Sequence, residues 1–370
     1  MNNPFQDQLT KLSRLEKRRE LIPANGIDFS SNDYLSLAHH DGIRQSLINA
    51  LQGGLALGSG GSRLLRGNHP EHENLEAFAT DYFGCEAALF MATGYLANLA
   101  LFTTVAARDD IVVMDELVHA SAKEGIHASP AKRAKFAHND ATACENAIKR
   151  ARKIGAANVW IAVESVYSMD GDIAPLDDLI AIADRYDAYL IVDEAHATGV
   201  HGPSGKGFSA AYEGRDNLIA LHTCGKALGQ AGALVTLPQV IKDFIINTAR
   251  SFIYTTAPTP LSAIAVQRAL EVVRDEPERR ARLHQLAAHA NKTFGVGETQ
   301  ILPLMVGGDG DALALAKQLQ AQGFDIRAIR TPTVPDGAAR LRLSITLNVD
   351  ETDIDALSAA YGSITSGEAS

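Results

Sequence analysis

An aspartate and a lysine near the middle of the chain have the types and positions to carry chemistry. Asp193 follows the apolar run 189–192, and Lys226 follows the run 218–221 among small residues. The carboxyl ends of parallel strands are where α/β proteins bind ligands. A partly desolvated lysine loses its proton more easily, and a neutral amine forms a Schiff base with a carbonyl. The two residues therefore suggest an amine nucleophile and a carboxylate at one site.

Each of these residues also has a simpler interpretation. A strand-end aspartate often caps the following helix, and a lysine in a glycine-rich turn is usually a surface residue. A P-loop is excluded, because its first glycine would fall at Ala220 and no Ser or Thr follows Lys226. Together, Asp193 and Lys226 resemble the layout of aspartate-aminotransferase-fold enzymes, in which the acid pairs with the pyridinium nitrogen of pyridoxal 5'-phosphate and the lysine holds the cofactor.

A third element, residues 93–98, follows the apolar run 87–91. Gly94 and Tyr95 open an expected helix, whose free backbone N–H groups and positive dipole end suit a phosphate. A plain strand–helix turn fits the same residues.

The segments that must position these residues alternate in type. Apolar runs of four or five β-prone residues, bounded by Asp, Gly or Pro, are separated by helical patterns, which predicts a mainly parallel central sheet buried on both faces. These runs are 111–114, 159–163, 189–192, 218–221 and 233–236.

The two ends of the chain have a different texture. Residues 5–20 are expected to form a helix, and a charged helix is expected at 272–290. Beyond it we expect strands at 302–306, 325–330 and 340–345, with helices at 312–322 and 351–361. The expected domains are an N-terminal helix and extended segment (1–36), a large α/β domain (37–270) and a small α+β domain (271–370).

The composition limits the classes of function. A net charge of −10 argues against general binding to nucleic acid or to an anionic membrane. Cys85, Cys144 and Cys224 form no C-x-x-C pair, so neither a disulfide framework nor a thiolate metal site is indicated. No apolar run reaches the ~18 to 20 residues needed to span a bilayer. We expect a soluble, reduced, cytoplasmic protein without a metal.

Across nearly its whole length the sequence resembles the α-oxoamine synthases. The fold that this resemblance implies is the pyridoxal-phosphate-dependent, aminotransferase-like α/β fold (fold type I), with a mainly parallel central sheet and a smaller C-terminal α+β domain. The matching segments, in chain order, are residues 29–35, 58–62, 136–140, 168–172, 192–199, 223–227, and 330–335 with 340–342.

The resemblance implies a role for each cofactor residue. Lys226 holds pyridoxal 5'-phosphate and moves protons at the substrate α-carbon, Asp193 pairs with the ring nitrogen, and His119 stacks on the ring. A satisfied histidine at a helix start is the alternative for His119. The other implied contacts are His196 and Ser168 at the phenolic oxygen, Gly94, Tyr95 and Thr223 at the phosphate, and Thr255 or Thr256 of the partner subunit, also at the phosphate.

The implied substrate contacts are fewer. Arg342 grips the amino-acid carboxylate, a task that suits its planar two-pronged donor, and Asn32 lies near the substrate. The segment between residues 19 and 29 is shorter than is usual in the family, so the N-terminal substrate-facing arginine is Arg18 or Arg19. Arg63 and Arg66 either meet the acyl donor or form surface ion pairs.

The implied reaction is the decarboxylative condensation of an amino acid with an acyl-CoA or acyl-carrier-protein thioester, in a homodimer with its active site at the subunit interface. Residues 63–72 and 328–335 resemble members that use L-alanine and a pimeloyl thioester. Glycine or serine with another acyl-CoA is the alternative. Outside the class we considered a non-catalytic partner subunit, which typically loses the lysine, and a nucleotide-dependent oxidoreductase, for which the glycine-rich fingerprint after an early strand is lacking.

Overall fold

The computed structural model describes residues 3–367. By the contacts among its residues the chain divides into two compact units. The smaller unit contains Met1–Asn32, Met169–Asp172 and Ala281–Ser370, and the larger contains Asp33–Ser168 and Ile173–Arg280. The domain limits expected from the sequence, after residues 36 and 270, stay predictions.

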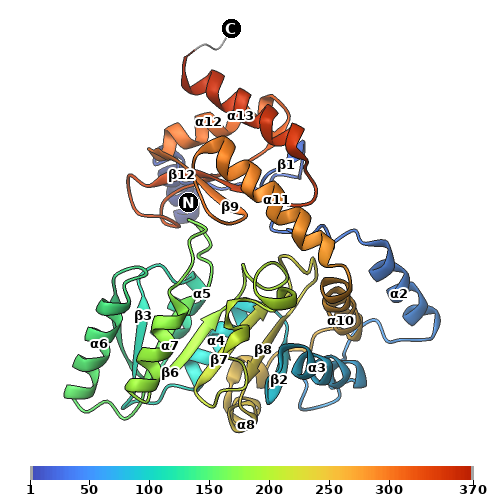
Figure 1. The fold of residues 1–370 in the computed structure, drawn as a ribbon, viewed down its shortest axis with the longest axis vertical. Helices are drawn as coiled ribbons and strands as arrows, with labels where there is room; N and C mark the ends of the chain where they lie inside the picture. Colours follow the sequence, from blue (N-terminus) through green and yellow to red (C-terminus); the bar gives the residue numbers. More distant parts are fainter. Residues whose placement is uncertain (1–2, 368–370) are drawn as a thin grey trace. The chain divides into compact units, whose positions relative to one another are not determined.

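The larger unit is built on one twisted sheet (Figure 1). Within residues 3–367 this sheet has seven strands in the order β2-β8-β7-β6-β5-β3-β4, and only β8 runs antiparallel to its neighbours, β2 and β7. All five expected runs are strands of this sheet, which confirms the expected fold class. The strands are β2 (Ala87–Met91), β3 (Ile111–Asp115), β4 (Lys132–Phe136), β5 (Val159–Glu164), β6 (Tyr189–Asp193), β7 (Leu218–Thr223) and β8 (Ala233–Leu237).

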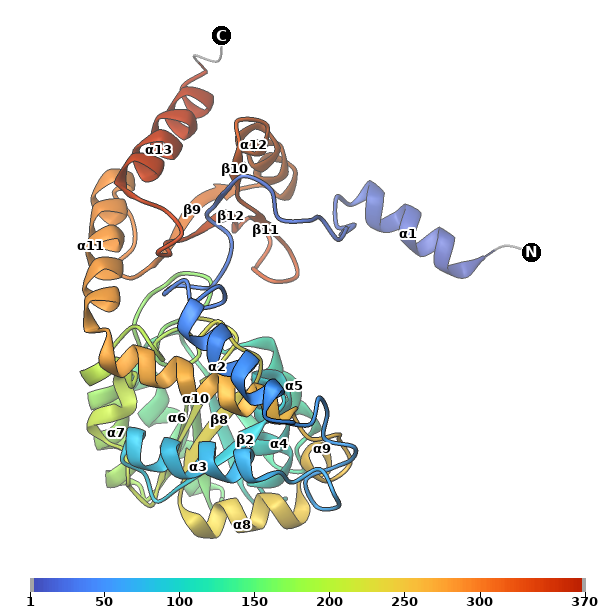
Figure 2. The same ribbon diagram turned by 90° about the vertical axis from the view of Figure 1, so that its right-hand side faces the viewer.

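Helices cover both faces of this sheet, and α3, α8 and α10 are seen most clearly in Figure 2. The helices of this unit are α2 (Asp41–Gln52), α3 (Pro70–Phe83), α4 (Gly94–Thr104), α5 (Ala120–Ala128), α6 (Ala141–Lys153), α7 (Leu176–Arg185), α8 (Gln239–Thr248), α9 (Arg250–Ile253) and α10 (Pro260–Asp275).

The core of the larger unit follows from the alternation of strand side chains. In β3, Val112 and Met114 pack with α4 and α5, whereas Ile111 and Val113 pack with α6 and α7. Both faces are therefore dry, which explains why these strands are continuous apolar runs in the sequence.

The smaller unit contains a three-stranded antiparallel sheet and a short parallel pair. The sheet has the order β11 (Ala328–Ile329), β12 (Ala339–Ser344), β9 (Ile301–Gly307), and β1 (Ile27–Asp28) pairs with β10 (Phe324–Asp325). The remaining helices of the chain are α1 (Pro4–Arg14), α11 (Pro277–Phe294, which begins in the larger unit), α12 (Asp309–Ala321) and α13 (Glu351–Thr365).

Three expected elements differ from the structure. The N-terminal helix ends at Arg14 instead of residue 20; it buries no side chain, so no packing extends it. The helix expected at 272–290 is two helices, because Pro277 cannot continue α10 and biases Glu276 away from helical geometry. The strand expected at 325–330 is the two short strands β10 and β11.

Within residues 3–367 no helix combines the length and the apolar character needed to cross a bilayer.

Candidate active site

A pocket of about 100 Å³ lies where β2, β3, β5, β6 and β7 end. These five strands are parallel to one another, so their carboxyl ends meet at one edge of the sheet. Seven of the residues expected at the cofactor lie together here. The pocket is lined by Gly94, Tyr95, Asn98, His119, Ser121, Glu164, Asp193, Ala195, His196, Leu221, Thr223 and Lys226.

Asp193, the last residue of β6, is held in place by two donors. Its Oδ1 accepts from the N–H of Ala195 at 3.0 Å, and its Oδ2 accepts from Nδ2 of Asn98 at 2.9 Å. Its side chain is buried, with 8% exposed. Both bonds fix the orientation of the side chain, which suits a partner for a ring nitrogen.

His119 caps the start of α5 and also lines the pocket, so the two expected roles are compatible. Its Nδ1 accepts from the Ser121 N–H at 3.2 Å and lies 2.7 Å from the Ser121 hydroxyl, which in turn accepts from Nδ2 of Asn98 at 3.0 Å. Burial lowers the pKa of the His119 imidazole, and the positive charges of Lys226 and Lys123 lower it further. The negative charge of Asp193 opposes them but does not reverse the shift. His119 is therefore neutral at pH 7.

The start of α4 supplies backbone donors to the pocket. Thr93 caps the helix by accepting from the N–H of Leu96 at 3.1 Å, and Gly94 and Tyr95 are the first two helical residues. A Cβ built on Gly94 would lie 3.1 Å from Oγ1 of Thr223, so glycine allows the β7 end to approach the helix. This arrangement of a helix start and a hydroxyl fits a phosphate.

Lys226 lies half-buried in the loop after β7. The loop is closed by the bonds from Cys224 N to Gly232 O (2.9 Å) and from Gly229 N to Lys226 O (2.7 Å). Gly229 has φ +63°, and a Cβ there would lie 2.4 Å from the backbone N of Ala38. Glycine at 229 thus lets the loop that carries Lys226 pack closely against the backbone of Leu37 and Ala38.

His196 and Ser168, the residues expected at the phenolic oxygen, are placed differently. His196 is 3% exposed, lines the pocket and contacts the Tyr34 hydroxyl through Nδ1 at 2.7 Å. Ser168 is not among the described residues that line the pocket, but its N–H donates to Oε2 of Glu164 at 3.1 Å.

Asn98, Ser121, Tyr34 and Glu164 are site residues that the sequence did not reveal. Asn98 and Tyr34 lie inside segments 93–98 and 29–35, which were singled out in the sequence for other residues. Glu164 ends β5 and pairs in register with Asp193. The signal that could have found it is its position at the end of an apolar run.

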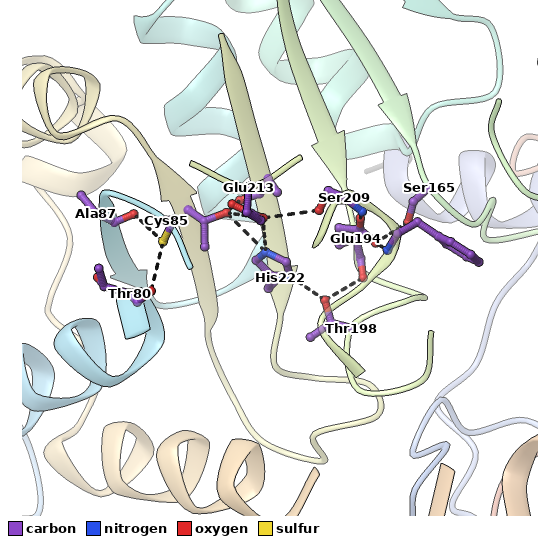
Figure 3. Close-up of polar contacts among 12 residues, drawn as sticks. Thr80, Cys85, Ala87, Ser165, Glu194, Thr198, Ser209, Glu213 and His222 are labelled. Atoms are coloured by element: carbon purple, nitrogen blue, oxygen red, sulfur yellow. Dashed lines mark hydrogen bonds and ion pairs between the residues drawn. The ribbon is translucent and has the colours of Figure 1, made fainter. Parts of the chain in front are cut away.

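A buried polar network surrounds Glu194 and His222 (Figure 3). Glu194 accepts from the Ser165 hydroxyl and from the Ser209 N–H, both at 2.5 Å. Thr198 bridges the Glu194 carbonyl (2.9 Å) and Nδ1 of His222 (2.8 Å). Burial raises the pKa of Glu194. Glu194 and His222 directly adjoin Asp193 and Thr223, so this network fixes the strand ends that carry them.

The other expected residues of the larger unit lie elsewhere. Thr255 lines a separate small cavity with Arg63, and Thr256 is exposed. Arg63 forms an ion pair with Glu76 at 2.8 Å, and only 9% of the Arg63 side chain is exposed, so this ion pair is buried and does not lie at the surface. Arg66 is exposed. Arg63 and Glu76 also line the larger cavity of about 420 Å³, away from the strand ends.

The expected substrate residues belong to the smaller unit. Arg342 on β12 is 8% exposed and donates to the Ser344 hydroxyl at 2.7 Å. Asn32 is half-buried. The Arg18 side chain is half exposed and forms an ion pair with Glu20, with 3.8 Å between Nε and Oε1. Arg19 donates a hydrogen bond to the Thr333 hydroxyl at 3.2 Å. Their relation to Lys226 stays a prediction.

The parallel sheet with an acid, an amine and a helix start at its strand ends defines a fold-type-I, aminotransferase-like enzyme. The chain belongs to the aminotransferase class I and II family, whose family model matches residues 24–360. This membership agrees with the resemblance to the α-oxoamine synthases seen in the sequence.

Individual relatives narrow the comparison. An 8-amino-7-oxononanoate synthase of Chromobacterium violaceum is 42% identical, over 96% of each chain. The crystal structure of 8-amino-7-oxononanoate synthase from Francisella tularensis is 27% identical, with a TM-score of 0.77 over 93% of this chain and 98% of that chain. A high-resolution structure of SPT with a PLP internal aldimine is 25% identical, with a TM-score of 0.86 over 92% of this chain and 87% of that chain.

Proposed function

We propose that this protein is an 8-amino-7-oxononanoate synthase. It is a pyridoxal-phosphate-dependent acyltransferase that condenses L-alanine with pimeloyl-CoA or a pimeloyl-carrier protein, releasing CO2, the free thiol and 8-amino-7-oxononanoate, a step of biotin biosynthesis. The observation that carries the proposal is that Lys226 and Asp193 line the same pocket, in a chain 42% identical to a synthase of that name.

The pocket residues fit pyridoxal 5'-phosphate by their chemistry. The Lys226 amine would bond the aldehyde carbon, and Asp193 would pair with the ring nitrogen. His119 would lie against the ring, and His196 with Ser168 would serve the phenolic oxygen. The N–H groups of Gly94 and Tyr95 with the Thr223 hydroxyl would hold the phosphate. When bound, the cofactor supplies an electron sink for a pair released at the amino-acid α-carbon.

The residues of the chain then divide the remaining work. Asp193, fixed by Asn98 and Ala195, would keep a proton on the ring nitrogen, which would maintain the electron sink. The Lys226 amine would take the proton from the amino-acid α-carbon and later return one to it. His119, neutral at pH 7, adds no competing positive charge beside Asp193.

The smaller unit would supply the substrate contacts. The Arg342 guanidinium would bind the alanine carboxylate with two parallel hydrogen bonds, and Asn32 would lie beside the same substrate. Arg18 or Arg19 would face the acyl chain. Supporting this assignment, Arg342 is held by Ser344 on a strand and is largely buried, which fixes its orientation.

The active form is proposed to be a homodimer with its site at the subunit interface. Thr255 or Thr256 of the partner subunit would complete the phosphate site, which agrees with their absence from the described lining of the pocket in their own chain. We expect the enzyme in the cytoplasm, where its three free cysteines stay reduced.

A parallel substrate assay tests the proposed reaction. Purified protein with added pyridoxal 5'-phosphate is given L-alanine with pimeloyl-CoA, glycine with acetyl-CoA, and serine with palmitoyl-CoA, while free thiol and CO2 are measured. The highest kcat/KM is expected for alanine with the pimeloyl thioester. A preference for another pair would assign the neighbouring activity, and no turnover with any pair would indicate a non-catalytic subunit.

A further inference from the structure

Glu164 is a buried carboxyl that the proposed roles leave unused. It ends β5 opposite Asp193 in the strand register, lines the same pocket and is 2% exposed. Its Oε2 accepts from the Ser168 N–H at 3.1 Å. Within residues 3–367 its Oε1 has no hydrogen-bond partner. An unpaired buried polar atom is costly, so an oxygen of this kind beside a ligand pocket indicates a contact to the ligand.

The charges around Glu164 determine its ionisation. Burial raises the pKa of Glu164 to about 8, and the negative charges of Asp193 and Asp115 act in the same direction. Lys226 opposes them, and Lys123 on α5 is also close enough to interact. The carboxyl is therefore mostly protonated at pH 7 and loses its proton as the pH rises through about 8.

The two strand-end carboxyls differ in what surrounds them. Asp193 receives two hydrogen bonds, from Asn98 and from the Ala195 N–H, which stabilise an anion. Glu164 receives one from the described part of the chain, donated by Ser168. Two neighbouring carboxyls seldom ionise together, and the less well-stabilised one keeps its proton. A protonated carboxyl can donate a hydrogen bond, whereas a carboxylate only accepts.

We propose that Glu164 is a cofactor-contacting residue whose protonated Oε1 donates a hydrogen bond to the phenolic oxygen of the pyridine ring. The inference rests on the proposed function for the identity of the bound group. Ser168, expected at that same oxygen, donates its N–H to Glu164, so Glu164 lies in the region assigned to this contact. Asp193 thus supplies the negative charge at one side of the ring, and Glu164 a neutral donor at another.

Three variants of full-length protein separate these roles. Glu164→Gln keeps a neutral donor, Glu164→Leu removes it, and Glu124→Gln on the exposed face of α5 is the matched control. The cofactor is removed, and its rebinding is followed by visible absorbance at pH 7 and pH 9. At pH 7 wild type, Glu164→Gln and the control are expected to agree within about threefold, and Glu164→Leu to bind about tenfold more weakly, the loss expected for one hydrogen bond.

The pH dependence gives the sharper result. With a pKa of about 8, only about a tenth of Glu164 is protonated at pH 9. Wild type should therefore lose about tenfold in affinity between pH 7 and pH 9 relative to Glu164→Gln, and the control should follow wild type. This comparison holds even if Glu164→Leu fails to fold.

Distinct outcomes would overturn the two claims. If Glu164→Gln binds as weakly at pH 7 as a protein without the donor, an ionised carboxylate is required and the inference is wrong. An unchanged ratio of wild type to Glu164→Gln between pH 7 and pH 9 also rejects it. A wild-type protein that develops no visible band with the cofactor removes the proposed function, and this inference with it.

Discussion

The Asn98 side chain is expected to set the position of the Asp193 carboxylate, and Asn98→Ala tests this. Asn98 is 2% exposed and donates from Nδ2 to Oδ2 of Asp193 at 2.9 Å and to Oγ of Ser121 at 3.0 Å. A hydrogen bond to a charged group contributes about 1.5–3 kcal/mol and a neutral one about 0.5–1.5 kcal/mol. The folded protein should therefore lose about 2–4.5 kcal/mol of stability, the sum of the two bonds.

The effect on the cofactor follows from the bond to Asp193 alone. If Asp193 must be reoriented before it can pair with the ring nitrogen, about 1.5–3 kcal/mol is lost from binding, which is roughly 10- to 100-fold in affinity. Asn98→Asp should be weaker still, because it places a second carboxylate beside Asp193.

Cofactor titration of the apoprotein by visible absorbance, together with its thermal unfolding, measures both effects. Asn74→Ala, at an exposed position of α3, is the matched control and should resemble wild type in both assays. If Asn98→Ala binds the cofactor within twofold of wild type and unfolds at the same temperature, the positioning role of Asn98 is refuted.

Three further predictions concern other parts of the larger unit. Gly94→Ala adds a Cβ 3.1 Å from Oγ1 of Thr223 and should weaken binding of pyridoxal 5'-phosphate several-fold by displacing that hydroxyl; equal affinities would contradict the phosphate assignment. Glu76→Ala leaves the largely buried Arg63 without its carboxylate and should destabilise the fold by about 3–5 kcal/mol, measured as a lower unfolding temperature. For the apoprotein, the raised pKa of Glu164 means that the folded state holds a proton that the unfolded state loses. Its stability relative to Glu164→Gln should therefore fall between pH 4.5 and about 8, and a constant difference would exclude the raised pKa.

The central sheet could be predicted from the sequence because its strands are buried on both faces. Strands in that environment are encoded by short apolar runs between polar residues. All five runs that the sequence predicts as strands are strands in the structure. The antiparallel direction of β8 and its place between β2 and β7 could not be predicted, since they depend on crossover connections and not on local residue types.

The site was only partly visible in the sequence for a similar reason. Asp193 was found because it directly follows an apolar run, and Gly94 and Lys226 because each lies within a few residues after one. The strand-end rule places such residues together. Asn98 meets Asp193 across 95 positions of the chain, and Glu164 meets it through strand register. The contact of Asn98 has no local signature in the sequence, whereas Glu164, like Asp193, directly follows an apolar run and was overlooked. The ion pair of Arg63 with Glu76 likewise needed coordinates to be distinguished from an acyl-donor contact.

The proposed chemistry requires that Lys226 bonds the cofactor while Asp193 faces the same ring. The most direct measurement is borohydride reduction of the protein loaded with pyridoxal 5'-phosphate, followed by protease digestion and mass spectrometry of the peptides. We expect one phosphopyridoxyl adduct, on Lys226, and none in Lys226→Ala. An adduct on another lysine of the wild type, or an unchanged adduct in the variant, would contradict it.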